Sequence, residues 1–397
     1  MKKFFGNLTV RLLLSVIVGI LLGSFISEGP MLAVLFVKQI TGQLIFFLVP
    51  LIIFGFVASS IAQLSGNVSR LLLFVFSIAY VSSVGAAFFG AGVSRVLVPV
   101  LDIPQIVSER PLPVLPFTLE IPPLMSVMSA LVIAVFMGLG SIWVDKLYAE
   151  SATNTQNDNV IKKFLVQFQH IVLSLVNRLL IPILPFYIAA NFAALAYGGS
   201  ISAFTVFLPV LVAVILCQYI WLALLYSIAS GYSGKNGWKV LRHYGPAYMT
   251  ALGTMSSAAT LGVALDCASK SPVLDKKVRE FAVPLFSNIH LCGSILTEVF
   301  FIMVVSQLLY GTMPEWSTLT MFILLLGLFA IGAPGVPGGT VLASLGIVIS
   351  IVGFDEAGTA MLIAIFALQD SFGTACNVTG DGALTLITTK FSQKDKS

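Results

Sequence analysis

Apolar stretches long enough to cross a lipid bilayer recur along the whole of this sequence, and no other feature constrains its fold as strongly. Of its 397 residues, 58% are hydrophobic and only 10% are charged. A soluble domain carries about 25% charged residues, and a helix needs about 20 apolar residues to span a bilayer. The sequence therefore predicts an all-α polytopic membrane protein with no separate soluble domain.

Six segments in the first part of the chain have the uniform apolar character of ordinary transmembrane helices. The most polar stretch of the chain, DKLYAESATNTQNDNVIKK, separates the fourth segment from the fifth and is expected to be an aqueous loop. The six expected spans lie near residues 8–26, 41–63, 70–98, 124–147, 165–197 and 203–230.

Basic residues flank the first span and end the chain, so the small net charge of +4 reflects membrane topology rather than nucleic-acid binding. By the positive-inside rule both termini are expected in the cytoplasm, which requires an even number of crossings. The first segment mimics a secretory signal, but Arg11 interrupts it and no clear cleavage site follows, so we expect an uncleaved helix. The basic residues are Lys2, Lys3, Arg11, Lys390, Lys394 and Lys396.

Other motifs in the sequence do not indicate a metal, a disulfide or a cofactor. None of the cysteines forms a CxxC pair, so we interpret them as free thiols. The run GAPGVPGG lacks the lysine and the strand of a phosphate-binding loop. No cofactor is therefore expected. The cysteines are Cys217, Cys267, Cys292 and Cys376.

The pattern changes after about residue 245, where two apolar segments carry small residues at their centres. In YMTALGTMSSAATLGVALDCA the centre is rich in Gly, Ser, Ala and Thr, and in FILLLGLFAIGAPGVPGGTVLASLGIVIS it is the Gly/Pro run 332–339. Each half of these segments is too short to cross a bilayer. Both patterns predict re-entrant hairpins, in which two half-helices meet at a tip.

Each hairpin is followed by an apolar span that polar residues and glycines interrupt. The first, FAVPLFSNIHLCGSILTEVFFIMVVSQLL, contains Asn288, His290 and Gly293, and the second, FALQDSFGTACNVTGDGALTLITTKF, contains Asn377 and Gly380. We expect both to be broken helices, which occur at membrane depth only inside protein or along a wet cavity. Paired interruptions of this kind are the best sequence pointer to the substrate site of a secondary transporter.

Four polar residues of the last segment, Asp370, Thr374, Asn377 and Asp381, fall at i, i+4, i+7 and i+11. On a helix they form one polar stripe about 16 Å long. A charged residue at bilayer depth costs ~3 kcal/mol on insertion scales. Two carboxylates on one face therefore indicate a bound cation, a substrate or a partner, and a structural polar interface between helices is the alternative.

The preceding interrupted span places His290, Ser294, Thr297 and Glu298 on one face as well. Burial disfavours an ionised carboxylate, so Glu298 is expected to take up a proton and to serve as a proton carrier. The alternative is an ion pair with a Lys or Arg. His290 is a second candidate for proton coupling, because histidine is the side chain that can change charge near neutral pH, although a lone histidine is more often a hydrogen-bonded structural residue.

The motifs GTMSSAATLGV, GAPGVPGG and NVTGD resemble those of the dicarboxylate/amino acid:cation symporter family, the glutamate transporter family. The resemblance covers essentially the whole chain. It implies a homotrimer whose protomers have eight transmembrane helices and two re-entrant hairpins in inverted repeats. An elevator-type transport domain (70–123 and 203–397) would move against a static scaffold (1–69 and 124–202), with the second hairpin as a gate.

The resemblance also implies a substrate site and cation sites, residue by residue. Asp370 would hold the α-amino group of the substrate, Asn377 its α-carboxylate, and N–H groups beside Ser257 would receive a carboxylate. The implied substrate residues are Ser256, Ser257, Gly335, Val336, Asp370, Gly373, Thr374 and Asn377. The implied sodium ligands are Asn377, Asp381, Ser82, Ser83 and the carbonyl groups of Ala330, Ile331 and Ala333.

The departures from the family pattern favour a neutral substrate and a proton as the coupling ion. Gly373 stands where transporters of acidic amino acids have an arginine, so a second carboxylate would be left unpaired. The run LQDSFGTACN resembles the serine/threonine branch. HLCGS replaces the family's NMDGT, so His290 and Cys292 stand in place of an Asn and an Asp, and both are poor sodium ligands. Glu298 occupies the position where proton-coupled relatives carry an acid.

The sequence thus predicts a plasma-membrane (inner-membrane) symporter of a small neutral amino acid, coupled to H⁺ rather than Na⁺. Its expected partners are the substrate, the bilayer and two further copies of the chain, without nucleic acid. The alternatives are sodium coupling, a glutamate, aspartate or dicarboxylate substrate, and a channel. An aspartyl enzyme is disfavoured because Asp370 and Asp381 lie three turns apart, whereas a shared-proton dyad needs about 3 Å.

Overall fold

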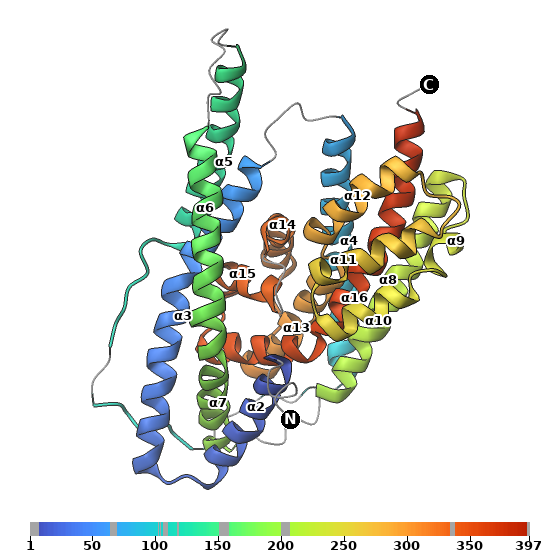
Figure 1. Ribbon diagram of the computed structural model, residues 1–397. Helices are drawn as coiled ribbons and strands as arrows, with labels where there is room; N and C mark the ends of the chain where they lie inside the picture. Colours follow the sequence, from blue (N-terminus) through green and yellow to red (C-terminus); the bar gives the residue numbers. More distant parts are fainter. Residues whose placement is uncertain are drawn as a thin grey trace.

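The computed structural model is helical throughout the part of the chain that it describes, with no strand there (Figure 1). That part comprises residues 8–63, 70–101, 103, 105, 110–116, 119–150, 159–199, 207–333 and 338–394. Six of its helices are long and apolar enough to cross a membrane by length and composition, and four shorter apolar helices accompany them. The predicted polytopic helical architecture is therefore confirmed, while the count of eight crossings stays a prediction.

The helices of the first half follow the expected spans closely except for the second. That helix begins at Glu28 rather than near residue 41, and Lys38 within it pairs with Glu356 at 3.7 Å. The fifth span is one long helix with a π-helical turn, η1, in its middle. The elements are α2 (Leu8–Phe25), α3 (Glu28–Ala62), α4 (Arg70–Val100), α5 (Val127–Glu150), α6 (Val160–Leu175), η1 (Val176–Leu180), α7 (Ile181–Tyr197) and α8 (Phe207–Ser233).

Shorter helices dominate the second half, as the small-residue centres of its segments predict. Its elements are α9 (Trp238–Leu241), α10 (Gly245–Thr254), α11 (Ser257–Ser269), α12 (Lys276–Ile289), α13 (Cys292–Tyr310), α14 (Trp316–Gly332), α15 (Gly339–Ile347), η3 (Val348–Val352) and α16 (Glu356–Lys394). We call α10 and α11 hairpin 1, and α14, α15 and η3 hairpin 2.

The turn of hairpin 1 has a clear local cause. Met255 ends α10 in the left-handed region, with φ +51°, and it is the one non-glycine residue with positive φ in the described part of the chain. The side chain of Ser256 then caps α11 by accepting a hydrogen bond from Ala259 N at 3.3 Å. The tip of hairpin 2, residues 334–337, lies outside the described residues.

One of the two expected helix breaks is present and the other is not. The chain leaves the helical conformation at His290 and Leu291, between α12 and α13, as predicted. The last helix, α16, runs for 39 residues without interruption through Asn377 and Gly380, so the prediction of a break there is wrong. Gly380 serves close packing instead, because a Cβ on it would lie 2.9 Å from the His290 ring.

The helices pack in two groups (Figure 1). The first group surrounds α13 and α16, which are buried over most of their length. Helices α4, α8, α10 and α12 pack on α13, on α16 or on both, while α2, α3, α5, α6 and α7 pack mainly on one another. Links between the groups include Tyr187 Oη, which donates to the Glu356 carbonyl at 2.9 Å. The division into a transport domain and a scaffold, and relative motion between them, stay predictions.

Candidate functional site

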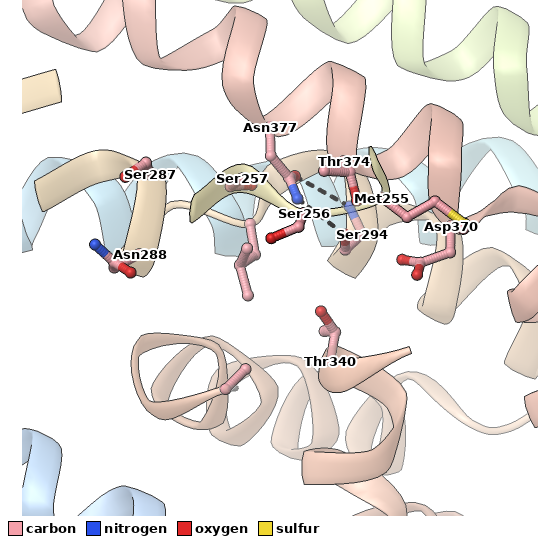
Figure 2. Close-up of a pocket in the computed structure, with 12 residues that line it drawn as sticks. Met255, Ser256, Ser257, Ser287, Asn288, Ser294, Thr340, Asp370, Thr374 and Asn377 are labelled. Carbon is pink, nitrogen blue, oxygen red and sulfur yellow. Dashed lines mark hydrogen bonds between the residues drawn. The ribbon is translucent and has the colours of Figure 1, made fainter. Parts of the chain in front are cut away.

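A small cavity lies where hairpin 1, hairpin 2, the α12–α13 break and the middle of α16 meet (Figure 2). Its volume is about 30 Å³, which holds a few water molecules at roughly 10–15 Å³ each. The lining residues are Met255, Ser256, Ser257, Ser287, Asn288, Leu291, Ser294, Ala333, Thr340, Asp370, Thr374 and Asn377.

Asp370 is the one charged side chain among these lining residues, and it is 6% exposed. Its Oδ2 accepts a hydrogen bond from Gly338 N at 2.7 Å. Gly338, with φ +72°, is the N-cap of α15, so the carboxylate faces the positive end of a helix in hairpin 2. The hydroxyls of Thr340 and Thr374 face the same space (Figure 2). A substrate ammonium placed here would meet a carboxylate and two hydroxyl groups.

Asn377 lines the cavity, but most of its polar capacity is spent on the start of α13. Its Oδ1 accepts from Gly293 N at 2.7 Å and from Ser294 N at 3.2 Å, while its Nδ2 donates to Ser294 Oγ at 2.9 Å. The amide thus satisfies two N–H groups that the helix break would leave without partners. One N–H of Asn377 remains for a substrate carboxylate.

The tip of hairpin 1 brings the start of α11 to the cavity. Ser256 and Ser257 both line it, and Ser257 is buried. The first N–H groups of a helix have no intrahelical partners, and they favour an anionic group. The predicted carboxylate site at this tip therefore has a suitable position.

Two residues at the end of α12 line the opposite side of the cavity from Asp370 (Figure 2). Ser287 Oγ donates to the Pro284 carbonyl at 2.9 Å, and Asn288 Nδ2 donates to the same oxygen at 2.8 Å. The serine hydroxyl has no second hydrogen to donate, and the Asn288 Oδ1 is held on the other side of its amide. The exposed Asn288 amide also keeps a second N–H, so this end of the cavity offers neutral donors and acceptors without a charged group.

A second polar cluster lies near the cavity but does not line it. His290 Nδ1 lies 2.9 Å from Asp381 Oδ1, and His290 Nε2 lies 2.9 Å from Ser82 Oγ. The neighbouring Ser83 Oγ accepts a hydrogen bond from Leu291 N at 3.3 Å. The side chains of Ser82, His290 and Asp381 are all buried. The polar stripe of α16 is therefore divided, because Asp381 points to the helix break rather than to the cavity.

Glu298 lies in the middle of α13, fully buried among apolar residues. Its Oε1 is hydrogen-bonded to Ser344 Oγ of hairpin 2, and its Oε2 has no partner among the described residues. Ser344 Oγ also lies 3.0 Å from the Val341 carbonyl. No Lys or Arg of the described chain pairs with Glu298, so the ion-pair alternative finds no support there.

The remaining predicted residues are only partly brought together. Ala333 lines the cavity, while Gly335 and Val336 lie outside the described residues. Gly373 is buried beside the cavity, and a Cβ on it would lie 3.3 Å from Ser294 Oγ. The implied sodium ligands, which belong to more than one expected site, stay predictions: Ser82 contacts His290, Ser83 contacts Leu291, and Ala330 and Ile331 lie in the last turn of α14.

Several lining residues were missed from sequence, and some had a signal. Asn288 and Ser294 flank the helix break that the sequence predicted, so the two ends of that break were candidates. Thr340 follows the tip of hairpin 2 directly. Met255, Ser287 and Leu291 carried no signal that distinguishes them from packing residues. The missed residues are Met255, Ser287, Asn288, Leu291, Ser294 and Thr340.

Comparison with known proteins supports the transporter interpretation. The sequence profile of the Sodium:dicarboxylate symporter family matches residues 8–391. The chain is 28% identical over 229 residues to Excitatory amino acid transporter 2 of Mus musculus, covering 55% of this chain and 39% of that protein. It is 33% identical over 161 residues to Excitatory amino acid transporter 3 of Homo sapiens, covering 41% of this chain and 30% of the relative.

A third relative, Excitatory amino acid transporter 1 of Homo sapiens, is 30% identical over 184 residues, which cover 46% of this chain and 33% of the relative. The matches thus span between about a third and two-fifths of these relatives' length. All three are named for excitatory amino acids, so the predicted nearness to a neutral amino acid branch is not confirmed.

Proposed function

The chain belongs to the sodium:dicarboxylate symporter family, and on that premise we propose that it is a symporter of a small neutral amino acid, coupled to protons. The family and the relatives named above are transporters rather than enzymes. The long apolar helices agree with a multi-pass membrane protein. Substrate, coupling ion, plasma-membrane location, cytoplasmic termini, the elevator motion and the homotrimer are parts of the proposal.

The observation that carries the amino acid assignment is Asp370 as the single charge of the cavity lining. A carboxylate at this depth is costly unless an opposite charge joins it. Within the described residues it receives only a backbone N–H, from Gly338. A substrate ammonium would neutralise it, while the start of α11 and the free N–H of Asn377 would receive the substrate carboxylate.

The same lining supports a neutral side chain on the substrate. A second carboxylate would find no Lys or Arg among the described lining residues, and it would face only neutral groups at Ser287 and Asn288. Buried charge without a partner is strongly unfavourable. The runner-up, glutamate or aspartate, draws its support from the names of the relatives.

Proton coupling is supported by the hydrogen-bond count around Ser344. A hydroxyl carries one hydrogen, yet Ser344 Oγ lies in hydrogen-bond reach of two acceptors, the Glu298 carboxyl and the Val341 carbonyl. If Glu298 is protonated, it donates to Ser344 Oγ, and Ser344 donates to Val341. All three groups are then satisfied without a buried charge, which is the form suited to cross apolar surface.

The test is uptake by purified protein in liposomes, with a panel of amino acids and imposed ion gradients. We expect uptake of serine-like substrates to rise with an inside-alkaline pH gradient and to persist when a large organic cation replaces sodium. Strict sodium dependence without any response to the pH gradient would contradict proton coupling. A preference for glutamate over serine would contradict the neutral substrate.

A matched variant sharpens that test. Glu298→Gln keeps a donor toward Ser344 and behaves as a permanently protonated acid, so we expect exchange of substrate across the membrane to continue. Accumulation driven by the pH gradient should be lost, because no proton is released. Exchange and pH-driven accumulation that fall together, or that both survive, would remove Glu298 from the coupling step.

A further inference from the structure

The histidine at the break between α12 and α13 occupies an unusual position for a membrane-buried ring. His290 is fully buried, and both ring nitrogens lie 2.9 Å from an oxygen atom, Ser82 Oγ on α4 and Asp381 Oδ1 on α16. The contacts join three elements that are far apart in the sequence. The imidazole thus fills the space between a carboxylate and a hydroxyl.

Oxygen atoms of this kind are the ligands that hard cations prefer. The family is named for sodium, so the fit of sodium to this place can be examined. The ring occupies the space between the two side chains, because its nitrogens lie 2.9 Å from Asp381 Oδ1 and 2.9 Å from Ser82 Oγ. Sodium does not fit between Asp381 and Ser82 while His290 is present.

We propose that His290 is a tethered replacement for an inorganic cation, so that the site at Asp381 is closed by the chain itself and exchanges no sodium during transport. As an imidazolium, His290 would donate one N–H to the Asp381 carboxylate and the other to Ser82 Oγ, so the pair would carry no net charge, as a carboxylate with a bound sodium ion does. The proposal deepens the proposed sodium-independent coupling, but it concerns a different place from Glu298.

The side chains around His290 and Asp381 agree with a lasting contact between these two residues. Tyr226 and Tyr244 lie near Asp381, and Cys292 lies beside His290; none of these side chains brings a second positive charge. Leu291 N donates to Ser83 Oγ, so α4 also holds the backbone next to the histidine. His290 is therefore held by the contacts of its two ring nitrogens and by the hydrogen bond of the neighbouring backbone N–H.

The proposal also predicts what removal of the ring would create. Asp381 Oδ2 is buried and has no partner among the described residues, and Asp381 Oδ1 and Ser82 Oγ would lose theirs. His290→Asn would vacate part of the ring's volume and add an amide oxygen. The variant would then border the vacated space with oxygen atoms, which suits sodium.

The experiment measures sodium binding alone, in purified full-length protein, by ²²Na⁺ binding and by thermal unfolding in NaCl against choline chloride at equal ionic strength. We expect no sodium-specific response from the wild-type protein. His290→Asn should gain saturable ²²Na⁺ binding and a sodium-specific rise of roughly 2 °C or more in Tm. The double variant His290→Asn/Asp381→Asn should lose the gain, and His170→Asn, on the exposed face of α6, should show none.

Two outcomes would overturn the proposal. One is sodium binding by the wild-type protein that Asp381→Asn removes, which needs no histidine variant and decides the matter even if His290→Asn does not fold. The other is a folded His290→Asn protein without any sodium response. Neither outcome depends on which amino acid is carried, so failure here and failure of the proposed substrate remain distinguishable.

Discussion

Asp370 and Asp381 lie on the same helix, three turns apart, yet the two buried carboxylates differ in their partners within the protein. Asp370 borders a cavity and receives a single backbone N–H, from Gly338. Asp381 is not among the described lining residues of that cavity, and it contacts the imidazole of His290. In the proposed function the substrate ammonium is the partner of Asp370, whereas the partner of Asp381 is a side chain of the same protein.

Removing the partner of Asp381 should produce the largest effect. His290→Ala leaves a buried carboxylate without its contact, and breaking one side of a buried pair costs about 3–5 kcal/mol. We expect a large fall in Tm, measured in choline buffer. His170→Ala, on an exposed helix face, should change Tm little, and equal losses in both variants would show that the buried contact is not special.

Removing the charge of Asp370 should weaken substrate binding instead of stability. A charge-assisted hydrogen bond contributes about 1.5–3 kcal/mol, so Asp370→Asn should lower amino acid affinity by roughly 10–150-fold or more. Calorimetry or ligand-induced thermal shifts would measure it. Unchanged affinity would reject the assignment of Asp370 to the ammonium group and would erase the difference between the two carboxylates.

Adding a positive charge near Asp370 should change which substrate binds. Gly373→Arg supplies a bidentate partner for a second carboxylate, so affinity for aspartate or glutamate should rise and affinity for serine should fall. The gain is limited because the new side chain must pass Ser294 Oγ, 3.3 Å from the Cβ position. Competition binding with Gly373→Ala as the control separates charge from bulk. A Gly373→Arg protein that still prefers serine would contradict the predicted position of the substrate side chain.

The sequence was sufficient to predict that the polar residues of α16 share one face of the helix, but not that they belong to two separate clusters. Helical spacing places Asp370, Asn377 and Asp381 on one face, and that spacing is a local property. The division depends on His290, which is 91 residues away from Asp381 in the sequence. Small residues likewise predicted both hairpins, because backbone at a tip needs them whatever packs against it.

The wrong prediction of a break in α16 has a similar cause. Polar residues and glycine in an apolar segment indicate an interrupted helix when only the segment itself is considered. Here Asn377 satisfies the N–H groups of α13, and Gly380 makes room for His290, so both residues serve a break in the neighbouring element. The sequence predicted two breaks: the one between α12 and α13 is present, and the one in α16 is not.

The smallest expected effect concerns the side of the cavity opposite Asp370. Asn288 Oδ1 should accept a hydrogen bond from a substrate hydroxyl, which contributes about 0.5–1.5 kcal/mol, so threonine should bind roughly 2–13-fold more tightly than its isostere valine. Asn288→Leu has a similar shape without the acceptor, and the ratio of the two affinities should approach one. Asn288→Asp keeps an acceptor and should preserve the preference for threonine, which separates the hydrogen bond from a change in shape. Equal binding of threonine and valine by the wild-type protein would place the substrate side chain elsewhere, while leaving Asp370 as the site of the ammonium group.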